Sequence, residues 1–145
     1  MFSKTCEYAV RAMIFIAQRS KKGEKVGIKE ISKEIDSPES FIAKILQDLS
    51  RKGLVLSSKG PNGGFYLEEE LLDGSLASIV KAVDGDKIFS GCGLGLKQCS
   101  EAHPCPIHYE FKAIRESMRV MLEQAKLSSF TVELEQKLTF LKQLD

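Results

Sequence analysis

The stretch SPESFIAKILQDLSRKG, residues 37–53, decides the fold together with the residues on either side of it. Ser37 and Pro38 are typical of a helix start, because serine caps free backbone donors and proline suits the first helical position. Apolar residues then recur at helical spacing, which predicts one buried face made of Phe41, Ile42, Ile45, Leu46 and Leu49. Gly53 is expected to end this amphipathic helix.

A β-hairpin is expected directly after this helix. Residues 54–58 and 65–67 favour two short strands, because they are rich in apolar and aromatic side chains and are separated by turn residues. Between them, Asn62-Gly63 readily adopts the positive φ values of a tight turn. The hairpin therefore carries a glycine-rich tip.

Two further helices are predicted upstream, over residues 5–19 and 28–35. Both show apolar residues on one face, namely Ala9, Val10, Met13, Ile14 and Ala17 in the first and Ile28, Ile31 and Ile35 in the second. Three helices followed by a hairpin is the order of a winged helix-turn-helix. The expected fold class is mainly α with a small β-hairpin.

The outer face of the third helix and the wing carry the candidate DNA-binding residues. A helix that reads the major groove presents short polar and long cationic side chains away from the core, and a glycine-rich wing lets the backbone approach phosphate. The candidates are Ser40, Lys44, Gln47 and Arg51 on the helix and Lys59, Gly60, Asn62 and Gly63 in the wing. Double-stranded DNA is the expected partner.

The distribution of charge supports this interpretation. The whole chain of 145 residues has a formal net charge of only +1. Residues 1–67 hold 12 Lys or Arg and 7 Asp or Glu, a net charge of +5, whereas residues 68–145 have a net charge of −4. The near-neutral total therefore conceals a basic half that suits a phosphate backbone.

Composition excludes several other classes. With 43% hydrophobic and 28% charged residues, the chain is typical of a globular protein, and its length excludes a large multidomain enzyme. Nothing resembles a catalytic pair or a nucleotide-binding loop, so we do not expect an enzyme. The most apolar early run, residues 8–17, is interrupted by Arg11 and is too short to span a membrane. A cytoplasmic location without membrane contact is expected.

A long amphipathic helix is predicted over residues 106–126. Its apolar residues form a single stripe made of Phe111, Ile114, Met118, Met121, Leu122 and Ala125. Such a stripe needs a packing partner, and a second copy of the chain is the simplest one. Shorter helices are expected on either side, one marked by Leu76, Ile79, Val80 and Val83 and a final one from Thr131 with Leu134, Leu138 and Leu141 on one side.

Three cysteines and a histidine follow one another with the spacing Cys92-x6-Cys99-x5-Cys105-x2-His108. Thiolates bind both iron–sulfur clusters and zinc, but the spacing lacks the tight C-x2-C pairs that structural zinc sites usually have. An iron–sulfur cluster is therefore favoured over zinc. Cys6 stands alone and is interpreted as a packed apolar residue.

Several segments together resemble the Rrf-type family of bacterial winged-helix transcription regulators, which includes IscR-, NsrR- and CymR-like members. The segments are residues 7–13, EYAVRAM, residues 53–55, GLV, residues 59–67, KGPNGGFYL, and the three-cysteine loop. The resemblance implies a homodimer built on the helix 106–126 that binds a two-fold-related DNA site. It also implies an iron–sulfur cluster between the loop and the partner's first helix.

Residue by residue, the resemblance assigns Cys92, Cys99 and Cys105 to the cluster. His108 matches the histidine ligand of IscR-like members, and Glu7 matches the acidic ligand that NsrR-like members take from the other subunit, so both are candidates for the fourth position. A two-iron, two-sulfur cluster is favoured, with a four-iron, four-sulfur cluster as the alternative.

The leading hypothesis is a transcription regulator that senses redox state, nitric oxide or cluster status. We expect a DNA-binding domain over residues 1–83, a cysteine-rich sensing loop over 84–105 and a helical dimerisation region over 106–145. RNA polymerase would be an indirect partner. One alternative keeps DNA binding but makes the loop a zinc site or a thiol switch, with a Cys99–Cys105 disulfide. A small iron–sulfur electron carrier is a third, weaker alternative.

Overall fold

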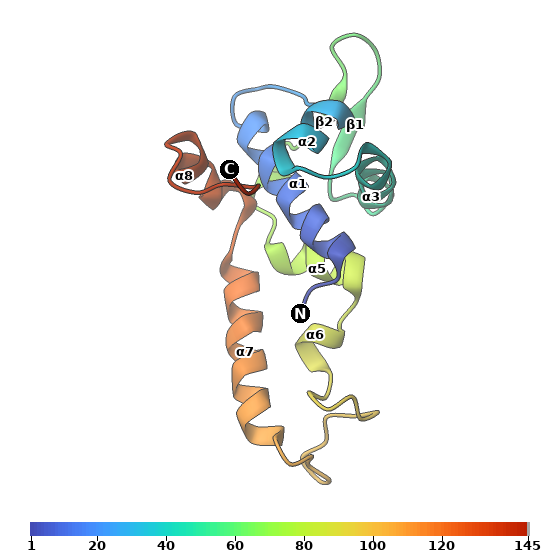
Figure 1. The fold of residues 1–145 in the computed structure, drawn as a ribbon, viewed down its shortest axis with the longest axis vertical. Coiled ribbons are helices and arrows are strands. Elements are labelled where there is room, and N and C mark those ends of the chain that lie inside the picture. The colour runs from blue at the N-terminus through green and yellow to red at the C-terminus, as the bar shows by residue number, and fades with distance from the viewer. Residues whose placement is uncertain (145) are drawn as a thin grey trace.

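A winged-helix unit forms one end of an elongated chain in the computed structural model, which describes residues 1–144 (Figure 1). Its elements are α1 (Lys4–Ser20), α2 (Ile28–Ile35), α3 (Glu39–Arg51), β1 (Leu56–Ser58) and β2 (Gly64–Tyr66). The predicted fold class is confirmed, because three helices are followed by one two-stranded antiparallel sheet. Among the described residues, no helix is both long and apolar enough to cross a membrane.

Helix α1 is the centre of the core. Its buried side chains pack against α2, α3, α5 (Leu76–Asp84) and the hairpin. The fully buried residues of α1 include Ala9, Ala12, Met13, Ile16 and Ala17. The residues that pack against them from α2 and α3 are Ile31, Ile35, Ile42, Leu46 and Leu49. The apolar periodicity thus determines which faces of the three helices turn inward.

The wing is fixed to the segment that precedes α2. Val26 and Phe65 exchange two backbone hydrogen bonds, with N···O distances of 3.0 and 2.8 Å. Gly64 makes this close approach possible, because its φ is +139° and a Cβ atom there would lie 2.7 Å from the Val26 carbonyl oxygen. The base of the wing is therefore held by three chain segments.

The start of α3 differs from the expectation. Helix α3 begins at Glu39, and Pro38 is the N-cap residue rather than the first helical residue. Ser37 is buried but does not cap the helix; its backbone joins the α2–α3 turn, where its carbonyl accepts a hydrogen bond from Ser32 Oγ. Phe41, expected in the core, is 53% exposed and lies at the rim with its ring centroid 6.3 Å from that of Tyr8.

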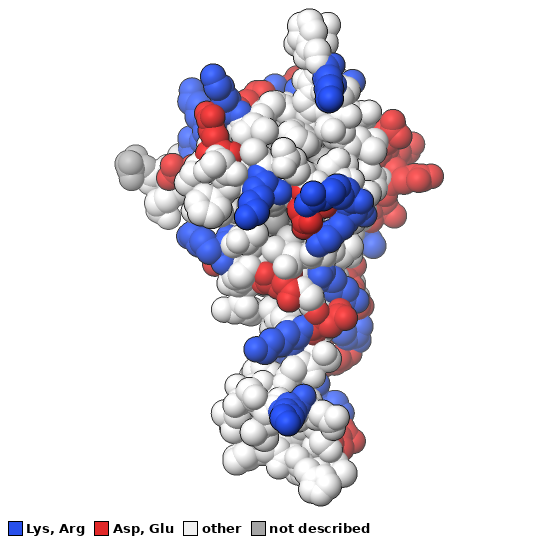
Figure 2. Space-filling view, turned by 90° about the vertical axis from the view of Figure 1, so that its right-hand side faces the viewer, with Lys and Arg blue, Asp and Glu red and all other residues white. Residues whose placement is uncertain are grey.

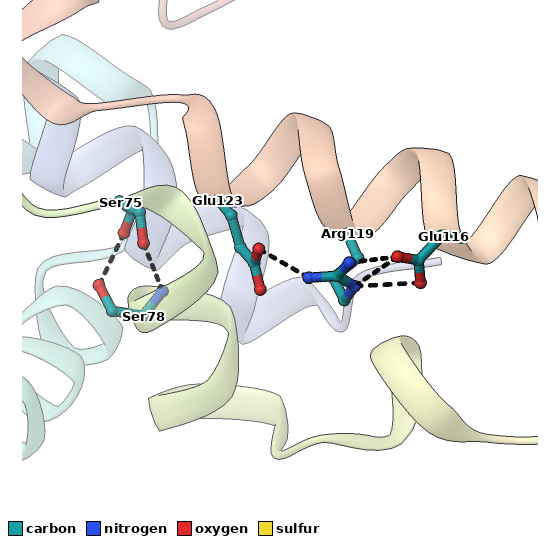
Figure 3. Close-up of polar contacts among 5 residues, drawn as sticks. All are labelled: Ser75, Ser78, Glu116, Arg119 and Glu123. Atoms are coloured by element: carbon teal, nitrogen blue, oxygen red, sulfur yellow. Dashed lines mark hydrogen bonds and ion pairs between the residues drawn. The ribbon is translucent and has the colours of Figure 1, made fainter.

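Below the winged-helix unit the chain extends along α7 (His108–Gln124), and the cysteine loop lies at the far end (Figure 1). The remaining elements are α4 (Glu69–Leu72), α6 (Lys87–Ser90), the 3₁₀-helix η1 (Leu127–Phe130) and α8 (Thr131–Glu135). Ser75 Oγ caps α5 by accepting from the Ser78 N–H at 3.3 Å, as drawn in Figure 3. Backbone hydrogen bonds from Leu76 to Ala125 and from Leu127 to Gly74 join the end of α7 to the start of α5.

The apolar stripe of α7 is two rows rather than one. The first row has spacings of three and four and includes all the buried residues of the helix. Its members are His108, Phe111, Arg115, Met118 and Leu122. Ile114 and Met121, expected in the same stripe, are 64% and 57% exposed. The helix is also shorter than 106–126, because it begins at His108 and Ala125 already has an extended backbone.

The final helix is shorter than expected as well. Helix α8 ends at Glu135, and Lys137 takes a positive φ of 57°, which an α-helix does not allow. Leu138 is consequently 67% exposed. Leu134 and Leu141 pack against the core of the winged-helix unit rather than along α7.

Candidate DNA interface and cysteine loop

The outer face of α3 carries the four side chains predicted to contact DNA. Ser40, Lys44, Gln47 and Arg51 are all exposed, whereas the opposite face of the helix is buried. Arg51 is held only loosely, because its Nη2 lies 3.4 Å from Asp48 Oδ1 on the protein surface. Its guanidinium can therefore exchange this carboxylate for a phosphate at little cost.

Asp48 is an acidic residue within this basic face. A hydrogen bond from Lys52 at 3.0 Å, and more weakly one from Arg51, hold the pKa of the Asp48 carboxyl below its usual value. Lys52 Nζ also donates to the Ala82 carbonyl at 2.5 Å, so it joins the end of α3 to α5. Asp48 thus stays ionised and orients two cations beside the recognition helix.

A groove of about 490 Å³ separates α3 from the wing. It is lined by Gln47, Ser50 and Arg51 on α3 and by Ser57, Ser58 and Lys59 on the hairpin, with Gly64 and Phe65 at its base. Three predicted DNA-binding residues are therefore brought to one groove. Gly60 and Asn62 are exposed at the wing tip, and the Gly63 N–H closes the turn by donating to the Gly60 carbonyl at 2.9 Å.

Lys25 is a basic residue beside the hairpin that sequence reasoning missed. Its Nζ lies 4.6 Å from the ring centroid of Tyr66 and donates to Ser58 Oγ at 3.2 Å. Within the sequence it belongs to a polar loop with no periodicity, and the contact with the hairpin depends on the Val26–Phe65 bridge. Only the tertiary structure places this cation beside the wing.

Figure 2 shows the face on which α3 and the wing lie. Basic side chains gather on its upper part around a few acidic ones, and the wing projects above them with a basic side chain near its base. The lower end, toward the cysteine loop, is mostly uncharged on this face. A concave, basic surface next to a projecting hairpin is suited to a duplex backbone.

The cysteine loop is joined to α7 at His108. This residue is only 3% exposed, and its Nδ1 lies 3.4 Å from the Cys99 Sγ. Its Nε2 is buried and has no hydrogen-bond partner. Because a buried imidazole nitrogen without a partner is unfavourable, the site is incomplete without a further group.

Cys92 and Cys105 are two further thiol donors, and both are half-buried. The Leu94 N–H donates to Cys92 Sγ at 3.4 Å. Backbone hydrogen bonds, the largest from Leu94, lower the pKa of the Cys92 thiol, and a hydrogen bond with the Cys105 side chain acts in the same direction. All four cysteines are free thiols. The structure therefore places Cys99 beside His108, and Cys92 and Cys105 are further free thiols of the same loop.

The chain alone does not gather these donors around one point. Among residues 1–144, no three His, Cys, Asp or Glu side chains come close enough to bind one metal ion. Glu7 lies on α1, where its Oε1 is 3.6 Å from Lys4 Nζ. Cys6 is fully buried, as expected, and burial followed by the nearby Asp84 raises the pKa of its thiol to about 12.

The donor types suit an iron–sulfur cluster and a zinc ion alike. Thiolate and imidazole are the ligands that iron–sulfur clusters and zinc both accept. A structural zinc ion needs four donors around one centre, whereas each iron of a two-iron cluster takes two protein ligands. Within residues 1–144, Cys99 and His108 lie close enough to form one such pair.

Comparison with known proteins agrees with this fold. Residues 2–133 match the Rrf2 family model, described as iron-dependent transcriptional regulators. A protein of Aquifex aeolicus named as an HTH-type transcriptional regulator is 31% identical over 121 residues, which cover 82% of this chain and 83% of that protein.

Two solved structures share the architecture. The IscR structure of T. potens superposes with a TM-score of 0.74 at 22% identity, covering 96% of this chain and 91% of that one. The structure of CymR, the global cysteine regulator of B. subtilis, gives a TM-score of 0.73 at 19% identity, covering 91% and 96%. At these identities the likeness shows the fold.

Proposed function

Because the chain belongs to the Rrf2 family of DNA-binding transcriptional regulators, we propose that it is an iron–sulfur-dependent regulator that acts as a homodimer on a two-fold-related site. The observation that carries this proposal is the buried His108, whose Nδ1 lies 3.4 Å from Cys99 and whose Nε2 has no partner. Cys92 and Cys105 supply the other thiol donors. The family description as iron-dependent supports the same choice of metal.

The residues that would hold the cluster are Cys92, Cys99, Cys105 and His108. When bound, the cluster supplies one-electron redox chemistry and a centre that oxidants and nitric oxide attack. Glu7 is the competing fourth ligand. Since it lies on α1 and not beside the cysteines, it would have to come from the partner subunit.

The exposed apolar row of α7 supports the homodimer. Ile107, Ile114 and Met121 are 39%, 64% and 57% exposed and follow at intervals of seven residues. A heptad spacing keeps such residues on one seam, which a second copy of the helix covers. The exposed row runs beside the row that packs on its own chain, so pairing would leave the cysteine loop in place.

Dimer geometry also gives the regulator its mechanism. The cysteine loop and the wing lie at opposite ends of one chain (Figure 1), so a cluster cannot contact DNA or α3 of its own subunit. A loop tied to the partner's α1 would instead set the distance between two recognition helices. Because half-site spacing fixes that distance, gain or loss of the cluster shifts the population of binding-competent dimers.

The test is the absorption spectrum of protein purified without oxygen, with iron and sulfide counts. We expect visible bands, which are lost in Cys92→Ala and kept in the matched variant Cys6→Ala. His108→Ala and Glu7→Ala distinguish the two candidates for the fourth ligand by the change in the spectrum. A colourless, iron-free protein that binds duplexes selected from a random pool as well as the reconstituted sample would refute the cluster but not DNA binding.

A second candidate function is a thiol switch, and one observation favours it. Backbone hydrogen bonds, the largest from Leu94, favour the Cys92 thiolate, so Cys92 is a candidate for oxidation in addition to the Cys99–Cys105 pair expected from the sequence. A peroxide would oxidise the Cys92 thiolate to a sulfenic acid, and the Cys105 thiol would then displace water to form the disulfide. Peptide mapping of metal-free protein after peroxide treatment checks this. Zinc without sulfide in the purified protein would instead indicate a zinc site.

A further inference from the structure

Arg115 is a buried cation on the face of α7 that carries the cysteine loop. Only 9% of the residue is exposed, and its Nη1 donates to the Gly91 carbonyl at 2.6 Å. Its Nε has no hydrogen-bond partner. In the part of the chain that the structure describes, none of the ion pairs includes Arg115.

Arg119, one turn further along the same helix, shows the ordinary arrangement. Figure 3 shows its guanidinium between Glu116 and Glu123, and the Glu123 Oε2 lies 2.7 Å away. A buried guanidinium without such an anion is unfavourable, because it has lost its hydration without gaining a counter-charge. Arg115 therefore has no directly paired carboxylate within residues 1–144; the nearby Glu116 pairs with Arg119 instead.

The segment that Arg115 holds leads directly into the first cysteine. Gly91 precedes Cys92, and the chain then passes over the ring of Phe111 at Gly93, where a Cβ atom would lie 2.8 Å from the ring carbons. Phe111 and Arg115 are four residues apart on α7 and so lie on the same face. The packing of Gly93 on the Phe111 ring and the charge-assisted hydrogen bond at Gly91 thus fix the backbone on both sides of Cys92.

The ion pair between the loop and α7 is weaker. Lys112 forms an ion pair with Glu101, but 47% and 62% of their side chains are exposed. Exposed pairs contribute little, whereas a hydrogen bond from a buried cation is among the stronger ones. Arg115 is therefore the firmer attachment.

We propose that Arg115 is a positioning residue that anchors the cysteine loop at Gly91 and balances the negative charge of the loaded site. The second half of this inference rests on the proposed iron–sulfur function, whereas the first half applies to the metal-free chain. Arg115 is not a ligand; it acts through the loop backbone and through its charge.

The charge of the loaded site explains why a cation belongs here. An oxidised two-iron, two-sulfur core carries two positive charges, so three thiolates and a neutral imidazole leave a net charge of −1, and reduction makes it −2. Covalent geometry keeps the Gly91 oxygen within roughly 5 Å of the Cys92 sulfur, which places the guanidinium within roughly 8 Å of that sulfur. At an effective dielectric constant of about 20, a unit positive charge at this distance would raise the equilibrium constant for one-electron reduction of the cluster by a factor of about thirty.

The test compares Arg115→Gln with the matched control Arg119→Gln. In metal-free protein, hydrogen–deuterium exchange of the segment 91–95 should accelerate about tenfold in Arg115→Gln, because a charge-assisted hydrogen bond that resists opening is lost. In reconstituted protein, the same variant should have a more negative cluster reduction potential. Arg119→Gln should change neither quantity.

Arg115→Lys makes the test independent of folding defects. It keeps the charge but loses the planar fork, so the potential should return toward the native value while exchange of 91–95 stays fast. Unchanged exchange in folded Arg115→Gln would overturn the anchoring role. A native potential in Arg115→Gln would overturn charge balance, and absence of any cluster would refute the proposed function while leaving the exchange result standing.

Discussion

Replacing Lys59 by alanine is the sharpest test of the DNA interface. Lys59 is exposed at the edge of the groove between α3 and the wing, and no ion pair within residues 1–144 involves it, so its loss should leave the fold unchanged. In a homodimer the substitution removes one phosphate contact from each half-site. The slope of the logarithm of the DNA-binding constant against the logarithm of the salt concentration should then become less steep by about 1.8.

This slope predicts a measurable difference in affinity. Between about 50 and 200 mM salt, native protein should lose about twelvefold more affinity than Lys59→Ala does. Fluorescence anisotropy with a labelled duplex of mixed sequence measures it, because the electrostatic part of binding does not depend on sequence. Lys22→Ala is the control, since Lys22 pairs with Glu135 at 2.7 Å and does not line the groove. If Lys59→Ala keeps the native slope, the wing does not contact phosphate through this residue.

Three other predictions follow from single contacts. Gly64→Ala should lower the free energy of unfolding by about 2–4 kcal/mol in urea titration, because its Cβ would collide with the backbone of Val26 at a positive φ; native-like stability would mean that the hairpin shifts freely. Ile114→Glu should convert the dimer to monomer in analytical ultracentrifugation, whereas Val132→Glu, at an equally exposed apolar residue outside α7, should not. Cys6 should resist alkylation in the native metal-free protein while the loop cysteines react. The folded-state pKa of the Cys6 thiol is also raised from 9.0 to about 12. The resulting contribution to the free energy of unfolding is present below pH 9 and is lost as the pH rises toward 12, by about 1.4 kcal/mol per pH unit. Cys6→Ala should abolish this pH dependence.

The helices and the hairpin of the winged-helix unit could be predicted from the sequence because each has a period or a turn signal. Residues 28–35 form the predicted second helix, and Asn62-Gly63 lies in the turn between the strands. The start of α3 could not be predicted, because a serine before a proline suits both an N-cap and a buried turn, and only packing against α2 selects the turn.

The long helix shows a different limit of periodicity. Two adjacent apolar rows on α7 combine into what looks like one wide stripe, and the sequence does not say which row its own chain covers. Arg115 lies in the covered row, although a charged residue is expected to face water. Its burial follows from the Gly91 carbonyl, which belongs to a loop without any period.

The candidate site could be predicted as a set of residues but not as an arrangement. The cysteine spacing indicates a metal-binding loop, yet it does not show that Cys99 lies beside His108. Loop pairings depend on long-range contacts, here the ring of Phe111 beneath Gly93. The same reasoning explains why Lys25 was missed at the wing.

Helix α7 connects the two halves of the proposed mechanism. One row of the helix holds the cysteine loop through His108 and Arg115, and the neighbouring row leaves Ile114 and Met121 exposed for a second copy. The end of the helix is joined by backbone hydrogen bonds to the start of α5, and Lys52 joins α5 to the end of α3. In the proposed mechanism, a change at the loop would reach the recognition helix along these packed, hydrogen-bonded elements, and the dimer seam along the same helix. This is why we expect substitutions at Arg115 and at Ile114 to alter DNA affinity although neither residue lies near the DNA-binding face.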